Sequence, residues 1–118
     1  MTGKYILDGK TPVVASDLPT WARWFETANR IVKQTPIADD IRVSTVFLGL
    51  DHSWGKGAPL LFETMCFGGP LDEAQDRYST WQEAEEGHKA MIAQVRAAMR
   101  ACGEGEACRQ LAPAPDPC

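Results

Sequence analysis

The chain has 118 residues, with 12 Lys and Arg against 16 Asp and Glu, a formal net charge of −4 and a hydrophobic fraction of 44%. This length and composition are typical of one soluble globular domain, and they exclude a wholly disordered chain. There is no run of Lys or Arg, which argues against direct nucleic-acid binding, and no apolar stretch approaches the about 18 residues of a membrane span.

The first half of the chain predicts a hairpin, a helix and two strands. Asp8-Gly9 lies between two short apolar runs within residues 5–14, and this dipeptide favours a β-hairpin. Ser16-Asp17 supplies an N-cap, and apolar residues at helical spacing predict a helix over 18–29. Runs rich in β-branched residues then predict strands over 30–35 and 41–50.

The second half predicts one more strand and a long helix. Residues 59–67 alternate as a strand, and Gly68-Gly69-Pro70 ends it. After a polar connection over 71–78, a capping-box sequence begins a helix that ends near 101. We therefore expect an α+β fold, a two-layer sandwich with an antiparallel sheet of three to five strands and two helices packed on one face. Residues 1–102 form the single domain, and 103–118 form a Pro/Gly-rich C-terminal tail.

Three segments, 42–52, 59–69 and 77–88, resemble a family of small uncharacterised proteins encoded by bacteriophages and prophages. The resemblance covers roughly residues 4–97. It implies a product made in the bacterial cytoplasm that binds and modulates a host component. Since no activity is attached to the family, the resemblance assigns no catalytic residue. The start of the chain lacks the apolar core of a signal peptide, which also favours the cytoplasm, where its four cysteines would be free thiols.

One polar residue interrupts the apolar stripe of the long helix. His88 stands where a leucine would be expected. We expect it to be buried against the sheet in a polar site, with Glu63 as a candidate partner. A metal or acid–base role and an exposed edge position are the alternatives.

The sequence offers little support for catalysis or metal binding. Cys102 and Cys108 are six residues apart and belong to no C-x-x-C pair, and His52 and His88 form no recognised ligand pattern. No phosphate-binding loop, nucleophile elbow or dinucleotide fingerprint is present. We expect no catalytic residue, no metal and no cofactor. The alternative is a small enzyme or ligand-binding domain that uses the loop 51–58 together with His88.

The charges favour a protein partner. Between residues 72 and 86 there are six acids and only one base, Arg77. We predict a partner-binding surface formed by Trp54, Asp72, Glu73, Asp76, Glu83 and Glu86. Exposed aromatic residues anchor interfaces, and like charges around them steer association with a basic surface.

The function that follows is that of a non-enzymatic phage-type accessory protein. It would bind a host bacterial protein and inhibit a host defence or nucleic-acid-processing complex, as an anti-CRISPR does. A solvated acidic face with no partner and a homodimer with a structural role remain as alternatives.

Overall fold

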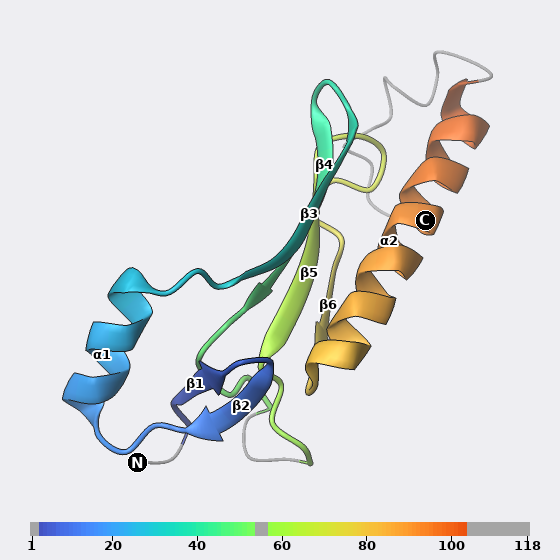
Figure 1. Ribbon diagram of the computed structural model, residues 1–118. Coiled ribbons are helices and arrows are strands. Elements are labelled where there is room, and N and C mark those ends of the chain that lie inside the picture. The colour runs from blue at the N-terminus through green and yellow to red at the C-terminus, as the bar shows by residue number, and fades with distance from the viewer. Residues whose placement is uncertain (1–2, 54–56, 104–118) are drawn as a thin grey trace.

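The computed structural model describes residues 3–53 and 57–103, and it has an α+β fold (Figure 1). A short hairpin of β1 (Tyr5–Asp8) and β2 (Thr11–Val14) comes first, followed by α1 (Leu18–Thr27). The main sheet contains four antiparallel strands, which lie side by side in the order of the sequence. They are β3 (Ile31–Ala38), β4 (Ile41–Phe47), β5 (Phe62–Phe67) and β6 (Gln75–Tyr78), and α2 (Trp81–Gly103) ends the described chain.

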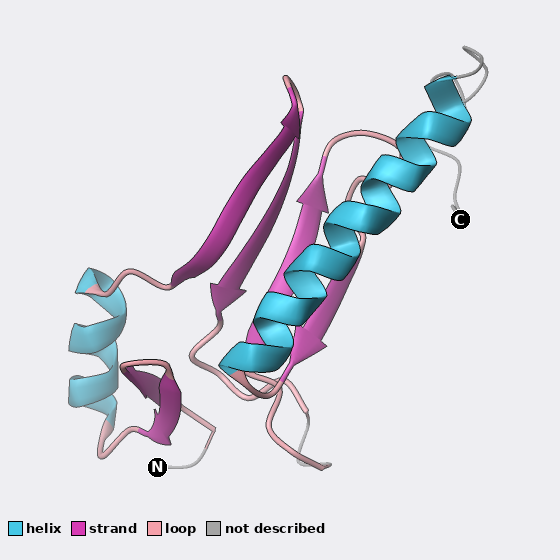
Figure 2. Ribbon diagram, turned by 45° about the vertical axis from the view of Figure 1, so that its right-hand side comes forward, coloured by secondary structure: helices cyan, strands magenta, loops and turns pink. Residues whose placement is uncertain are grey.

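The two helices have different places in the fold. Helix α2 runs diagonally along one face of the four-stranded sheet, whereas α1 lies beyond one end of the sheet, next to β1 and β2 (Figures 1 and 2). Trp21 and Phe25 of α1 stack on each other, and the indole N–H of Trp21 donates to the carbonyl of Gly49 at 3.1 Å. Gly49 has φ of +77°, and a Cβ there would collide with Phe25. The aromatic face of α1 therefore docks on the chain that leaves β4, and only α2 covers the sheet as expected.

Strand β6 lies where the sequence predicts a polar connection. Its residues pair with β5 from Phe62–Tyr78 to Met65–Gln75. A four-residue strand at a sheet edge can be polar, because one edge of its backbone has no neighbouring strand and some of its side chains face solvent. The absence of apolar alternation in Gln75–Tyr78 is therefore compatible with a strand, and it conceals the strand from pattern analysis.

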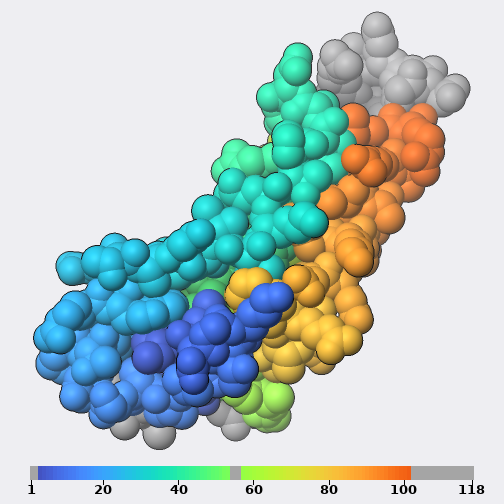
Figure 3. All heavy atoms as spheres, in the orientation of Figure 1, coloured from blue at the N-terminus to red at the C-terminus, as the bar shows by residue number. Residues whose placement is uncertain are grey.

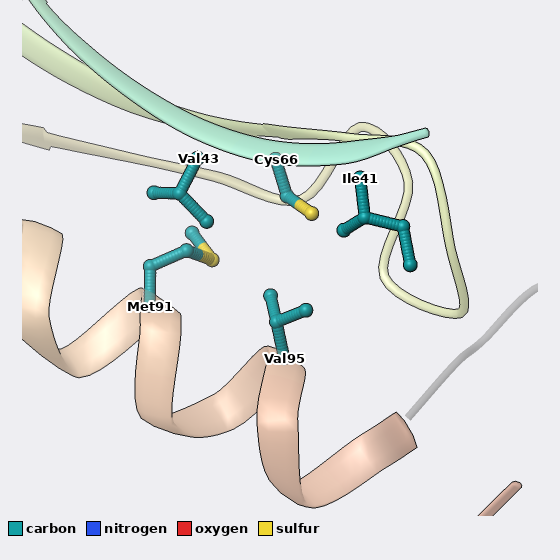
Figure 4. Close-up of a cluster of buried hydrophobic side chains, with 5 residues drawn as sticks. All are labelled: Ile41, Val43, Cys66, Met91 and Val95. Carbon is teal, nitrogen blue, oxygen red and sulfur yellow. The ribbon is translucent and has the colours of Figure 1, made fainter. Parts of the chain in front are cut away.

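The core between α2 and the sheet consists of two hydrophobic clusters. Figure 4 shows one, in which Met91 and Val95 of α2 point toward Val43, Cys66 and Ile41 of the sheet. The second cluster contains Phe47, Leu61, Phe62 and Ala84, with Trp24 and Trp81 at its margin. Phe47 is fully buried, which confirms its predicted place in the core. In residues 3–53 and 57–103, neither helix is long and apolar enough to cross a bilayer.

Candidate functional site

His88 is buried between α2 and the sheet, as predicted, with 1% of its surface exposed. Its Nδ1 lies 2.7 Å from the hydroxyl of Thr45, and its Nε2 lies 2.9 Å from the hydroxyl of Thr35. A neutral imidazole has one donor and one acceptor nitrogen, and a threonine hydroxyl can take either role. Both ring nitrogens are therefore satisfied without a charged partner.

Glu63 is not the partner of His88, so this part of the prediction is wrong. Side chains alternate along β5: Phe62, Thr64 and Cys66 face α2, and Glu63 faces the other way. On that opposite face the Glu63 carboxylate accepts a hydrogen bond from Arg77 Nε at 3.0 Å. The sheet itself separates the two residues that the sequence analysis grouped together.

The polar site continues across the sheet beyond His88. The hydroxyl of Thr45 also hydrogen-bonds that of Thr64 on the next strand. Burial raises the pKa of the Tyr78 phenol, and a hydrogen bond with Thr64 offsets part of that rise. Side chains from three strands, Thr35, Thr45 and Thr64, thus join His88 of α2 through hydrogen bonds, and Tyr78 of β6 lies beside them. We call these five residues the threonine–histidine network. It lies between the two hydrophobic clusters.

Sequence reasoning missed the other members of this network. Thr45 and Thr64 are fully buried polar residues on the α2-facing sides of β4 and β5. Their positions in otherwise apolar alternating runs were the available signal. A further signal is Gly87, a glycine inside a helix, because the Tyr78 ring occupies the space beside it. No pattern in the sequence links β6 to this site, since β6 was not recognised as a strand.

Burial governs the electrostatics of the site. It lowers the pKa of His88 from its ordinary value of 6.5, and the positive charge of Lys33 lowers it further. Burial also raises the pKa of the Cys66 thiol, with a smaller contribution from the charge of Asp72. The site thus favours a neutral imidazole and a protonated thiol, both of which suit a packed core.

The predicted acidic residues lie on the turn before β6, on β6 itself and at the start of α2. Asp72 and Glu73 lie in the turn after β5, Asp76 lies on the edge strand β6, and Glu83 and Glu86 lie in the first turns of α2, all of them exposed. We call these five residues the acidic edge. The single base among them in sequence, Arg77, points to the opposite face of the sheet and pairs there with Glu63. That is the only ion pair in the described part of the chain.

Two members of the acidic edge also accept hydrogen bonds from backbone amides. Asp72 accepts a hydrogen bond from the amide of Gly68 at 2.7 Å, and Glu83 accepts from the amides of Ser79 and Thr80. Thr80 in turn accepts from the amide of Glu83, which completes the predicted capping box. Glu73, Asp76 and Glu86 make no hydrogen bond to the backbone through their side chains in the described residues.

Glu73 has an unusual backbone conformation. Its φ is +74°, and it is the only residue other than glycine with a positive φ in the part of the chain that the structure describes. A side chain in this left-handed region costs about 1–2 kcal/mol, which glycine would avoid. Glu73 at this turn therefore makes the folded protein less stable than glycine would.

The loop 51–58 is only partly described. Asp51 accepts hydrogen bonds from the amides of Ser53 and Leu60, and these bonds hold its pKa below the ordinary range. These hydrogen bonds therefore join Asp51, at the start of the loop, to Leu60, which follows its end. Trp54, the predicted aromatic anchor, lies outside the described residues, as do residues 104–118 of the predicted tail.

In the described ranges, no three His, Cys, Asp or Glu side chains are close enough to hold a metal ion together. An open groove of about 320 Å³ lies between the end of β3 and the last turns of α2, lined by Ile37, Arg96, Met99 and Arg100. No protein-family model, curated protein or solved structure matches this chain.

Proposed function

We propose that this protein acts without catalysis, by docking its acidic edge on a basic surface of another protein. The observation that carries the proposal is the group of exposed carboxylates on β6, its preceding turn and the start of α2, from which the one nearby guanidinium is turned away to Glu63. Exposed carboxylates that form no ion pair among the described residues steer a complementary partner and raise the association rate.

The backbone at Glu73 supports the same proposal. Strained conformations persist where a side chain has a role that outweighs its cost. The carboxylate of Glu73 has no hydrogen-bond partner among the described residues, so folding gains nothing evident from it. A contact with a partner is the role that we assign to it.

The partner that we propose is a host bacterial protein. The phage or prophage setting expected from the sequence of residues 4–97 is itself part of this proposal. Host defence and nucleic-acid-processing complexes carry basic channels for nucleic acid, and an acidic protein edge is complementary to such a channel. The specific proposal is inhibition of such a complex by occupation of its channel.

The experiment is affinity capture from a bacterial lysate with the full chain, followed by mass spectrometry and measurement of the association rate with the captured partner. The test variant is Glu73→Lys with Asp76→Lys, because neither carboxylate holds the backbone. The matched control is Asp8→Lys with Glu26→Lys, two exposed acids on β1 and α1 that change the net charge equally.

The proposal expects the test variant to associate at least about tenfold more slowly at low salt and the control to match the parent. It also expects the parent to associate more slowly as salt is raised, since screening shortens the Debye length from about 30 Å at 0.01 M to about 3 Å at 1 M. Equal association rates for parent, test and control at low salt would contradict the acidic edge as the docking surface.

A further inference from the structure

The outer surface of α2 has a charge pattern that is complementary to itself. Six exposed residues recur at alternating spacings of three and four along the side of α2 away from the sheet: Glu83, Glu86, Ala90, Ala93, Ala97 and Arg100. This spacing is that of a coiled-coil seam. Its N-terminal end is acidic, its centre consists of alanines, and its C-terminal end is basic. We call these residues the α2 seam.

The helix dipole accounts for only part of this pattern. Acids are favoured in the first turn of a helix and bases in the last, and the effect fades within one turn. Glu83 and Arg100 fit that account. Glu86 and Arg96 lie further inside the helix, and Arg96 and Arg100 are like charges four residues apart, an arrangement that destabilises an isolated helix. Neither arginine forms an ion pair with any residue in the described ranges.

From this geometry we infer that α2 is the contact surface of a two-fold homodimer in which the two α2 helices pack antiparallel through the seam. An axis between residues 91 and 92 places Ala90 opposite Ala93, Glu86 opposite Ala97 and Glu83 opposite Arg100 of the second copy. Glu86 then lies between Arg96 and Arg100 of that copy. Each acidic end meets a basic end, which is the self-complementary arrangement that two identical antiparallel helices require.

The surface available for this contact is accessible. The outer side of α2 forms the yellow-to-orange flank of the molecule, and in Figure 3 no other described element crosses it. Alanines at the centre let two helix axes approach to about 8 Å, the close end of the usual range. The seam from 83 to 100 is roughly 27 Å long, so the contact is smaller than the about 800 Å² per partner of a standard interface. We therefore expect a weak, reversible and salt-sensitive dimer.

The test is sedimentation equilibrium of the full chain under reducing conditions, up to high micromolar concentration, at low and high salt. The parent should dimerise at low salt and dissociate as salt rises. Either single variant, Glu86→Arg or Arg100→Glu, should raise the dissociation constant of the dimer about tenfold, because each replaces attraction by repulsion at two symmetric places. Glu26→Arg on α1 changes the net charge as Glu86→Arg does and should leave the dimer unchanged.

The decisive variant combines Glu86→Arg with both Arg96→Glu and Arg100→Glu. Residue 86 lies 10 and 14 residues before these two positions, roughly 15 and 21 Å along one helix, so the reversed charges do not pair within one copy. In the antiparallel dimer the basic side chain at 86 lies between two carboxylates of the second copy, and only the contact of Glu83 with position 100 is repulsive, so the triple variant should dimerise more tightly than either single variant. A parent that stays monomeric at low salt, or a triple variant no tighter than the single ones, would overturn the inference. Glu83 and Glu86 belong to both the acidic edge and the α2 seam, so a dimer would cover part of the acidic edge; sedimentation of the chain alone decides the dimer separately from the binding of any other protein.

Discussion

The Tyr78 ring lies against the backbone of Gly87, in the space that a side chain at residue 87 would need. Strand β6 thereby contacts α2 one residue before His88, at the edge of the threonine–histidine network. The close approach explains why a glycine, which is unfavourable within helices, stands in the middle of α2.

Gly87→Ala tests this contact. The added methyl group would overlap the Tyr78 ring, so we expect a loss of about 1–3 kcal/mol in the free energy of unfolding despite the better helix propensity of alanine. Urea unfolding followed by circular dichroism gives the value. In a Tyr78→Ala background the same change should instead stabilise the protein by about 0.5–1 kcal/mol, because only the helix propensity then acts. A loss of equal size in both backgrounds would show that the ring is not the cause.

The network predicts a dependence of stability on pH. Because the pKa of His88 is lowered in the folded protein, the unfolded chain binds a proton more readily than the folded chain does. The stability contributed by neutral His88 is therefore fully present above the unfolded value of about 6.5 and is lost as the pH falls from there toward the lowered pKa. The free energy of unfolding of the parent should fall more steeply between pH 7 and pH 5 than that of His88→Gln. Parallel curves would refute this account of His88.

Phe47 tests the core. It is fully buried and contacts the rings of Trp24 and Phe62, with centroid distances of 5.7 and 5.3 Å. Phe47→Ala should lower the free energy of unfolding by about 3–5 kcal/mol, a large share of the stability of one domain. Phe67→Ala, on the half-buried sheet face opposite α2, should cost less. A urea midpoint for Phe47→Ala equal to that of the parent would contradict the packing described here.

Glu73→Gly is expected to stabilise the protein. Glycine relieves the backbone strain at φ +74°, but it also has a larger conformational entropy in the unfolded chain. After this entropy cost is subtracted, we expect the free energy of unfolding to rise by about 0.5–1 kcal/mol. Glu73→Ala keeps the strain and serves as the control. If the acidic edge binds a partner, the glycine variant should be more stable and should also associate more slowly.

The sequence by itself determined the local structure that depends on short-range physics. The hairpin within residues 5–14, the N-cap at Asp17 and the capping box at Thr80 all satisfy backbone groups within a few residues, and each was predicted correctly. The turn of the hairpin consists of Gly9 and Lys10, because Asp8 is the last residue of β1 and pairs with Thr11. The alternation in 41–47 and 62–67 also assigned the faces of β4 and β5 correctly. The burial of His88 followed from its place in an apolar helical stripe.

Only the tertiary structure decided which polar groups meet. The partners of His88 come from β3 and β4, and those strands reach it only once the sheet is formed and α2 is laid across it. Glu63 was grouped with His88 because the sequence pattern does not specify which face of β5 the helix covers. Strand β6 exists because β5 offers it a free edge, which no local propensity encodes. Contacts between residues distant in sequence depend on that assembly, and so the threonine–histidine network could not be predicted from residue spacing alone.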